Sequence, residues 1–220
     1  MNSPLPKQRD APISVADSAF YDAAFLRRYD ALQGASAEVK AAEQRILDEI
    51  VDLRQQSRLR CERYLDVGTC TGRYLIWAHD NGFRTLCGLD HSPDAIAHCR
   101  TKLTFPARLI EGSCLDMESY RGIENVDFVT MMMGTANHLT APELKTFFLN
   151  VSTVIATGGD LVLSTWRSSP ERLTLYTEAD ARKLCRIALN LAELQTTGAP
   201  LRTVNRVATS WHDLWVFRKI

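Results

Sequence analysis

The chain has 220 residues, a length that fits one domain with a substantial core and a small appendage. Its 26 lysines and arginines balance its 26 aspartates and glutamates, so no overall charge attracts it to nucleic acid or to an anionic membrane. No apolar run approaches the roughly 20 residues of a membrane span, and the first residues lack the apolar centre of a signal peptide. We therefore expect a cytoplasmic monomer or homodimer that binds neither nucleic acid nor membranes.

The cysteines indicate a reducing compartment. The six are spread widely, without a Cys-x-x-Cys pair, and most lie in apolar contexts. This distribution is typical of buried thiols and not of disulfides or of a metal centre. We therefore expect no metal site.

The N-terminal quarter of the chain is expected to be helical. Residues 1 to about 15 contain three prolines and are predicted to form a loose tail. From 16 to 58 the apolar residues recur at helical spacing, with a break at residues 34–36 and no strand pattern. The sequence thus divides into a tail and helical cap, 1–58, and a main domain, 59–220.

The main domain begins with a strand, loop, helix and strand that together are typical of nucleotide binding. Residues 64–67 form a short apolar run, 68–72 a loop of small residues, 73–78 a helical run, and 85–89 a second strand that ends at Asp90. Glycines allow the backbone to approach a ligand closely, and an acid at the tip of the second strand can accept both hydroxyls of a ribose.

The loop does not fit a dinucleotide site, because Cys70 and Arg73 occupy the third and sixth positions of that fingerprint, where glycines are required. It resembles instead the first motif of the class I S-adenosylmethionine (SAM)-dependent methyltransferases, acid-x-Gly-x-Gly-x-Gly, with Asp66, Gly68 and Gly72 in place. Cys70 stands where that family usually has its middle glycine. Either the loop sits slightly differently or the position tolerates a cysteine.

The remaining elements agree with this resemblance. Ser92 and Pro93 predict a helix start, with the helix ending near Leu103. Pro142 predicts a helix that ends near Ala156, with Gly158 and Gly159 as its stop. A further helix is expected over 178–188, and strands over 107–110, 126–133, 161–166, 189–195 and 211–218. The resemblance implies an α/β Rossmann-like methyltransferase fold: a mostly parallel seven-stranded sheet with an antiparallel last strand, preceded by the helical cap.

The resemblance also implies SAM as cofactor and a set of cofactor-binding residues. The family commonly has Gly-Asp after its third strand to meet the adenine amino group, but here Ser113 replaces the aspartate, so Ser113, Asp116 or water must do so. The backbone N–H of Cys114 is expected to meet the adenine ring. The expected cofactor-binding residues are Asp66, Gly68, Thr69, Cys70, Gly72, Asp90, His91, Ser113, Cys114, Met132 and Met133.

The methyl acceptor is expected beyond the fourth strand, where Asn137 and His138 follow. A hydroxyl or ammonium acceptor must lose a proton, and His138 is the best-placed base; otherwise it orients substrate or caps a loop. Asn137 offers both a donor and an acceptor. Tyr29 and Tyr176 are the other catalytic candidates, as walls of an aromatic cage, and each can equally be a packing residue.

Three functions fit these features. The first is N- or O-methylation of a small molecule, favoured because only about ten residues separate Trp166 from Tyr176 and leave little room for an acceptor domain. The second is an enzyme of the same fold that cyclises or transfers the amino-acid arm of SAM and releases methylthioadenosine. The third is a non-catalytic SAM-binding module. The nucleoside product distinguishes the first two, and bound SAM without a product leaves the third.

Overall fold

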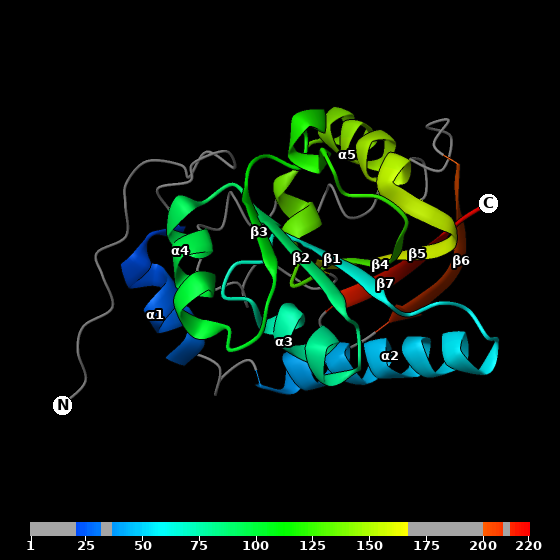
Figure 1. Ribbon diagram of the computed structural model, residues 1–220, viewed down its shortest axis with the longest axis horizontal. Coiled ribbons are helices and arrows are strands. Elements are labelled where there is room, and N and C mark those ends of the chain that lie inside the picture. Colours follow the sequence, from blue (N-terminus) through cyan, green and yellow to red (C-terminus); the bar gives the residue numbers. More distant parts are fainter. Residues whose placement is uncertain (1–20, 32–36, 167–199, 209–211) are drawn as a thin grey trace.

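The computed structural model describes residues 21–31, 37–166, 200–208 and 212–220, and these form one seven-stranded sheet (Figure 1). The strand order is β3-β2-β1-β4-β5-β7-β6, with β7 antiparallel to both of its neighbours and the other described pairs parallel. This confirms the predicted Rossmann-like methyltransferase fold. The strands are β1 Arg63–Val67, β2 Thr85–Asp90, β3 Arg108–Glu111, β4 Val126–Met131, β5 Ile155–Trp166, β6 Leu201–Ala208 and β7 His212–Lys219.

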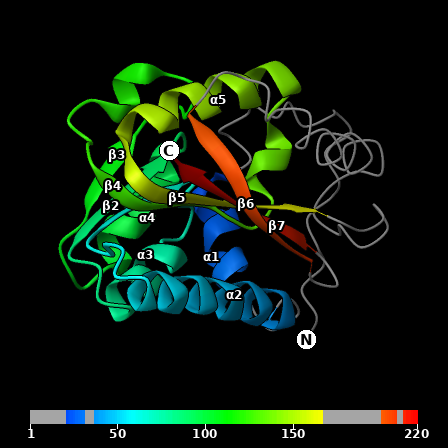
Figure 2. The ribbon, with the colours of Figure 1, turned by 90° about the vertical axis from the view of Figure 1, so that its right-hand side faces the viewer.

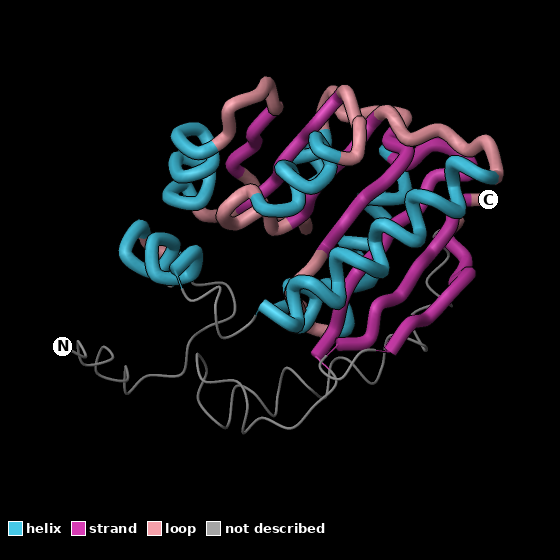
Figure 3. The backbone as a smooth tube through the Cα atoms, turned by 90° about the horizontal axis from the view of Figure 1, so that it is seen from below, coloured by secondary structure: helices cyan, strands magenta, loops and turns pink. Residues whose placement is uncertain are grey.

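Helices cover both faces of the sheet. Figure 2 shows α2 and α3 below the strands and α5 above them, and Figure 3 shows α2 running along the lower face. Helix α1 packs against α4 at one end of the sheet (Figure 1). The helices are α1 Ala23–Ala31, α2 Ala37–Gln56, α3 Arg73–Asp80, α4 Pro93–Lys102 and α5 Ala141–Val154, with short 3₁₀ turns η3 Met117–Tyr120 and η4 Thr135–His138.

The strands are buried on both faces, which explains their nearly continuous apolar runs. Successive side chains alternate between the two faces, so Leu65 and Val129 join the core beneath α5, whereas Tyr64 and Phe128 join the core beneath α2 and α3. Ile46, Leu47 and other apolar residues of α2 belong to that second core. The division of the chain at residue 58 stays a prediction.

The predicted helix starts are confirmed. The Ser92 side chain accepts a hydrogen bond from the Ala95 N–H at 3.2 Å, and Pro93 is the first residue of α4. Helix α5 has a capping box, in which Glu143 N–H donates to the Thr140 hydroxyl and the Glu143 carboxylate accepts from Thr140 N–H at 2.7 Å. Both arrangements satisfy backbone donors that the first helical turn leaves open.

The predicted helix stop at Gly158 and Gly159 is wrong. Helix α5 ends at Val154, and β5 begins at Ile155 and runs through both glycines to Trp166. Gly158 has a φ of +77°, and the register between β4 and β5 shifts here, so the glycines form an irregularity within a long strand. The Gly158 carbonyl accepts from Arg54 Nη1 at 3.0 Å, which fixes this backbone.

The sixth strand lies later in the chain than the sequence pattern indicated. The strand paired with β7 is Leu201–Ala208, whereas the predicted strand 189–195, the predicted helix 178–188 and Tyr176 lie outside the described residues. Strand β6 is at the edge of the sheet and much of it is exposed, so its sequence is polar and lacks the apolar run of a buried strand.

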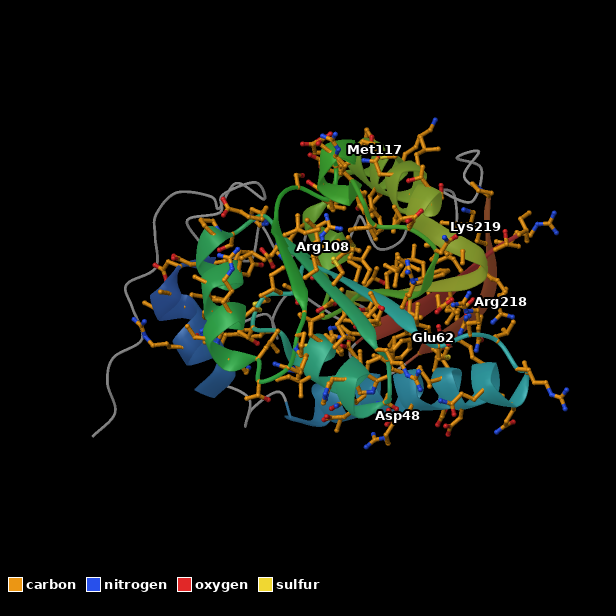
Figure 4. All side chains as sticks on the ribbon, viewed as in Figure 1. Asp48, Glu62, Arg108, Met117, Arg218 and Lys219 are labelled. Carbon is orange, nitrogen blue, oxygen red and sulfur yellow. The ribbon has the colours of Figure 1, made fainter. Side chains whose placement is uncertain are left out.

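A buried ion cluster fixes the C-terminal part of α2 to the sheet. Asp160 of β5 is fully buried and binds Arg54 at 2.6 Å and Arg218 at 2.7 Å. Arg54 also donates to the carbonyls of Gly158 and Arg60. Figure 4 shows Arg218 near the end of β7, on the opposite side of the molecule from α1 and α4. A buried carboxylate that offsets two guanidinium groups is costly to remove.

We therefore predict that Asp160→Asn lowers the free energy of unfolding by about 3–5 kcal/mol, because the buried Arg54 loses its counter-charge and the partly exposed Arg218 loses its partner. Urea unfolding followed by circular dichroism measures the change. Asp80→Asn is the control: Asp80 is exposed and, within the described part of the chain, pairs with His79, so its loss is expected to cost at most about 0.5 kcal/mol. Equal effects of the two substitutions would show that the ion cluster around Asp160 does not stabilise the fold.

Candidate active site

The loops after β1, β2, β3 and β4 meet at one edge of the sheet. The chain runs outward from β1 to β3 and then returns to place β4 on the other side of β1. In open α/β sheets ligands bind at this reversal, beyond the carboxyl ends of the strands. The loops after β1 and β4 lie in contact here, since a Cβ atom added at Gly68 would lie 2.6 Å from Cγ2 of Thr135.

The loop after β1 has a left-handed backbone at three alternate positions. Gly68, Cys70 and Gly72 have φ values of +74°, +48° and +73°. The position at which the family usually has its middle glycine therefore keeps a glycine-like conformation and holds a cysteine in it, at some cost in strain. The Cys99 thiol donates to the Cys70 carbonyl at 3.2 Å. Burial raises the pKa of the Cys70 thiol, so it stays protonated at neutral pH.

Asp90 connects this loop to the tip of β2. Its Oδ2 accepts from the Cys70 N–H at 2.8 Å and its Oδ1 accepts from the Ser92 N–H at 2.9 Å. Burial raises the pKa of Asp90, and these two N–H groups act in the opposite direction. Each carboxylate oxygen can accept more than one hydrogen bond, so Asp90 keeps the capacity to bind ligand hydroxyls.

Asp66 is the first residue of the glycine-loop motif. It lies next to the last residue of β1 and is almost fully buried. Its Oδ1 accepts from the Thr130 hydroxyl at 2.8 Å, whereas its Oδ2 has no hydrogen-bond partner among the described residues. Burial raises the pKa of Asp66 to about 7, although Thr130 and the nearby Thr69 hydroxyl act to lower it. The Thr69 hydroxyl lies near enough to stabilise the charged form of Asp66, although the two groups do not have the geometry of a hydrogen bond.

Arg73 was not among the predicted site residues. The sequence pattern used it only as an argument against a dinucleotide site. The nitrogens Nε, Nη1 and Nη2 of Arg73 are buried, and no group in the described part of the chain accepts a hydrogen bond from them. The guanidinium lies 5.8 Å from the centre of the Tyr29 ring. The sequence did carry a signal, since Arg73 directly follows the glycine loop.

In the loop after β3, the side chains predicted to contact adenine accept hydrogen bonds from nearby backbone N–H groups. Ser113 is exposed, and its hydroxyl accepts from the Leu115 N–H at 3.1 Å. Asp116 accepts from the Glu118 N–H at the start of η3. The carbonyl of Cys114 accepts from the Tyr120 hydroxyl, and burial raises the pKa of the Cys114 thiol to about 12. His91 Nδ1 lies 3.6 Å from Asp90 Oδ1, at the same edge.

The segment after β4 brings polar groups to the reversal point. Met132 is buried, Met133 has a φ of +56°, and the Gly134 N–H donates to the Ser164 hydroxyl of β5 at 3.1 Å. Asn137 is fully buried. Burial, and to a smaller extent the charge of His91, lower the pKa of His138 to about 4, so its imidazole is neutral at neutral pH.

Helix α1 and the two residues before it, Tyr21 and Asp22, lie over these loops. The hydroxyl of Tyr21 is 3.2 Å from Nε2 of His138, and its carbonyl accepts from the Ser92 hydroxyl at 2.9 Å. Tyr29 instead stacks on Phe25, with ring centres 5.5 Å apart. Tyr29 is the tyrosine that the sequence predicted near the reacting groups, but the structure brings Tyr21 to His138. Helical spacing alone could not separate the two tyrosines.

A second buried polar cluster was also missed. Glu43 of α2 accepts from the Tyr74 hydroxyl and pairs with His212 Nδ1 at the start of β7. Burial acts to raise the pKa of Glu43, but His212 and the hydrogen bonds outweigh it and the pKa lies below its usual value. The spacing of Glu43 from the buried Ile46, Leu47 and Ile50 places it on the apolar face of α2, a signal that could have marked it as buried.

Comparisons with known proteins agree with this geometry. Residues 65–159 match a family model described as a methyltransferase domain. A solved structure of magnesium protoporphyrin IX methyltransferase (ChlM) from Synechocystis PCC 6803 with bound SAM is similar, with 14% identity, 97% of this chain and 100% of that chain covered, and a TM-score of 0.62.

Two further solved structures are similar at low identity. The N-methyltransferase NodS from Bradyrhizobium japonicum WM9, in complex with S-adenosyl-L-homocysteine, is 20% identical over 72% of this chain and 78% of that chain, with a TM-score of 0.51. A SAM-dependent methyltransferase from Aquifex aeolicus is 16% identical over 74% of this chain and 84% of that chain, with a TM-score of 0.59. A search of curated protein sequences gave no match.

The strand order, the glycine loop and the acid at the tip of β2 define a Rossmann-like α/β protein whose candidate nucleoside site lies at the reversal of its sheet. Residues 65–159 match a methyltransferase domain, and the fold is that of the class I SAM-dependent methyltransferases. The cofactor is SAM, as the glycine loop predicted. None of the described helices is long and apolar enough to cross a membrane.

Asp66 gives a prediction about pH. Because its pKa is raised to about 7 in the folded state, folding favours the protonated form; this stabilisation is complete below the unfolded pKa of about 4 and is lost as the pH rises through 7. In Asp66→Asn, which cannot ionise, this loss is expected to disappear. Urea unfolding at pH 5 and pH 8 measures it: wild type should lose more stability than the variant between the two, by an amount on the order of a few kcal/mol. Parallel losses would contradict an ionisable, buried Asp66.

Proposed function

We propose that this methyltransferase acts on a small-molecule acceptor, by N- or O-methylation. The observation that supports the proposal most is the closeness of the segment before α1 to the reversal point: Tyr21 reaches His138 over the loops proposed to form the cofactor site. The equal numbers of basic and acidic residues give the chain no net positive charge to attract a nucleic-acid acceptor. Among similar structures, the ChlM and NodS enzymes are named as a magnesium protoporphyrin IX methyltransferase and an N-methyltransferase.

We assign the parts of SAM to the loops in the order in which the loops follow one another along the edge of the sheet. We place the ribose hydroxyls at Asp90, beside His91, and the adenine at the loop of Ser113 and Cys114. The remaining part of SAM follows the glycine loop toward the segment after β4. On this placement the other cofactor contacts come from Asp66, Gly68, Thr69, Cys70, Gly72, Met132 and Met133.

SAM supplies a methyl group on a sulfonium that is itself the leaving group, so the chain needs mainly to align the acceptor and exclude water. His138 and Asn137 are the proposed acceptor contacts beyond β4. The pKa of about 4 keeps His138 unprotonated, so it can accept a hydrogen bond from an acceptor hydroxyl or amine but holds a proton weakly. Tyr21 replaces Tyr29 as the aromatic residue nearest to it. Tyr176 keeps its proposed role and lies outside the described residues.

The product of the reaction tests this proposal. Purified protein is incubated with SAM alone and, in separate reactions, with SAM plus a panel of small amines, phenols or carboxylic acids. The nucleoside products are identified by mass spectrometry. We expect S-adenosylhomocysteine to form with at least one panel and to exceed the level with SAM alone. Methylthioadenosine as the product, or no product with any panel, would count against small-molecule methylation.

Asp90 provides the matching binding test. Asp90→Ala removes the carboxylate proposed for the ribose, and loss of charge-assisted hydrogen bonds is expected to weaken SAM binding more than about tenfold by calorimetry. Asp80→Asn, on the exposed end of α3, is the control with unchanged affinity. Circular dichroism checks that the fold is retained, since Asp90 also holds Cys70 and Ser92. Binding of SAM by folded Asp90→Ala within threefold of wild type would remove Asp90 from the site.

The cap gives a prediction about exchange. The Ala23 N–H at the start of α1 donates to Asp94 at 3.1 Å, and Tyr21, just before the helix, reaches His138. We expect residues 21–31 to exchange backbone hydrogens more slowly with SAM than without it, because closing the mouth shields the sulfonium from water. Mass-spectrometric hydrogen exchange measures this, with α5 as an internal control on the far face. Equal protection in both states would make α1 a fixed structural element.

A further inference from the structure

A fully buried carboxylate lies among the elements that border the candidate site and has no part in the chemistry described above. Glu43 of α2 accepts a hydrogen bond from the Tyr74 hydroxyl of α3 and pairs with Nδ1 of His212, the first residue of β7. The Ser164 hydroxyl of β5 helps to lower the pKa of Glu43, so it lies close to the same carboxylate. One side chain of α2 therefore meets groups from three other elements.

The groups around Glu43 lie near the carboxyl edge of the sheet, where the candidate site is. Tyr74 is the second residue of α3, which begins directly after the glycine loop. Ser164 is near the end of β5, and Trp166, the last residue of that strand, pairs with His212 in the antiparallel ladder. Glu43 thus joins the glycine-loop side of the site, at α3, to the side proposed for the acceptor, at β5 and β7.

The backbone of Gly134 extends this contact to the proposed acceptor residues. Its N–H donates to the Ser164 hydroxyl at 3.1 Å, and its carbonyl accepts from the Asn137 N–H at 2.9 Å. Gly134 has a φ of +74°, a left-handed conformation that glycine adopts without strain, and it immediately precedes η4. A displacement of Ser164 would therefore move the short turn that carries Asn137 and His138.

Packing alone does not require a charge at position 43. Ile46, Leu47 and Ile50 of α2 already place an apolar face in the core beneath α2 and α3. A buried carboxylate loses its hydration, and replacing a buried ion pair by apolar side chains of similar volume is often neutral or stabilising. A buried polar network instead favours one geometry, because each hydrogen bond needs its partner at a fixed distance and direction.

We propose that Glu43 is a positioning residue for methyl transfer, which holds Ser164 so that the turn at Gly134 presents Asn137 and His138 to the acceptor. The inference rests on the proposed acceptor contacts and adds the group that fixes them. Glu43 acts through Ser164 and Gly134, and not by contact with the reacting atoms. Such alignment matters, because a displacement of about 1 Å can lower the rate of a reaction about 100-fold.

The environment of Gly134 can be observed directly. Met133-Gly134 is the one Met-Gly step in the sequence. Protein labelled with carbonyl-¹³C methionine and ¹⁵N glycine therefore gives one amide signal that is coupled to a labelled carbonyl. The proton chemical shift and the hydrogen-exchange rate of this signal report the hydrogen bond to Ser164, and their measurement requires no acceptor.

The variants to compare are Ser164→Ala, Glu43→Gln and the control Asp48→Asn. Asp48 also links α2 to α3, since it accepts from the Trp77 indole N–H at 2.7 Å, but it is exposed on the outer side of α2 (Figure 4). The control therefore removes the charge of another helix-to-helix contact while leaving Glu43 and Ser164 in place.

Ser164→Ala is expected to move the Gly134 amide proton upfield and to speed its exchange at least about tenfold, because the N–H loses its acceptor. Glu43→Gln should shift the signal in the same direction by a smaller amount, because a neutral amide polarises the Ser164 hydroxyl less than a carboxylate does. Asp48→Asn should leave the signal unchanged. If Glu43→Gln does not fold, Glu43→Asp takes its place, with a shift expected because the shorter carboxylate is drawn away from Ser164.

Kinetics separate positioning from stability. With the acceptor that yields S-adenosylhomocysteine in the panel assay, Glu43→Gln is expected to lower kcat about 10- to 100-fold and to change the KM for SAM less than about threefold. Asp48→Asn should keep the kcat of wild type. A merely structural Glu43 would lower the melting temperature and leave both kcat and the Gly134 signal of the folded protein unchanged, which would overturn the proposal.

The remaining outcomes also decide the proposal. A shifted Gly134 signal with an unchanged kcat would overturn it, because the turn would then move without consequence for the reaction. If no acceptor in the panel gives a product, the proposed function fails by itself, and the Gly134 signal decides the assignment of Glu43: a shift in Glu43→Gln supports it, and an unchanged signal overturns it.

Discussion

The site depends on the hydrogen bonds that Asp90 accepts from the backbone of two loops. By holding the N–H groups of Cys70 and Ser92, its carboxylate fixes the glycine loop against the tip of β2 and fixes the start of α4 beside it. The Ser92 hydroxyl then holds the Tyr21 carbonyl, and Tyr21 reaches His138. One carboxylate therefore connects the loop after β1, the loop after β2, the cap and the segment after β4.

Much of the fold could be predicted because its signals are local. Buried parallel strands have apolar runs, and the Ser92-Pro93 pair marks a helix start, so the central strands and α4 were placed within a few residues. The errors came where tertiary structure decides. Gly158 and Gly159 resemble a helix stop, but Arg54 and the pairing with β4 hold them in a strand. Strand β6 lies at an edge, and its polar sequence shows no apolar run.

The candidate site divides in the same way. The glycine loop and Asp90 are sequence motifs, whereas the protonation of Asp66, the contact of Tyr21 with His138 and the isolation of Arg73 arise from segments far apart in the chain. Spacing could not show that a long side chain next to a glycine loop is buried without a partner. It also could not show that the cap covers Arg73 with Tyr29.

Helix α2 joins this site to the rest of the sheet through two buried ion pairs of different chemistry. Arg54 pairs with Asp160 through a guanidinium, whereas Glu43 pairs with the imidazole of His212. Ser164 connects this second pair to the site, because it accepts from the Gly134 N–H at the segment after β4 and helps to lower the pKa of Glu43. The position of α2 is thus set from both ends by polar contacts within an apolar core.

The central claim is that SAM binds across the reversal between β1 and β4, with its ribose at Asp90 and its amino-acid arm at the glycine loop. A crystal structure of the protein with S-adenosylhomocysteine tests this most directly. The expected result is that the ribose hydroxyls make hydrogen bonds to the Asp90 carboxylate. A nucleoside bound elsewhere, or one at this edge whose ribose does not contact Asp90, would contradict it.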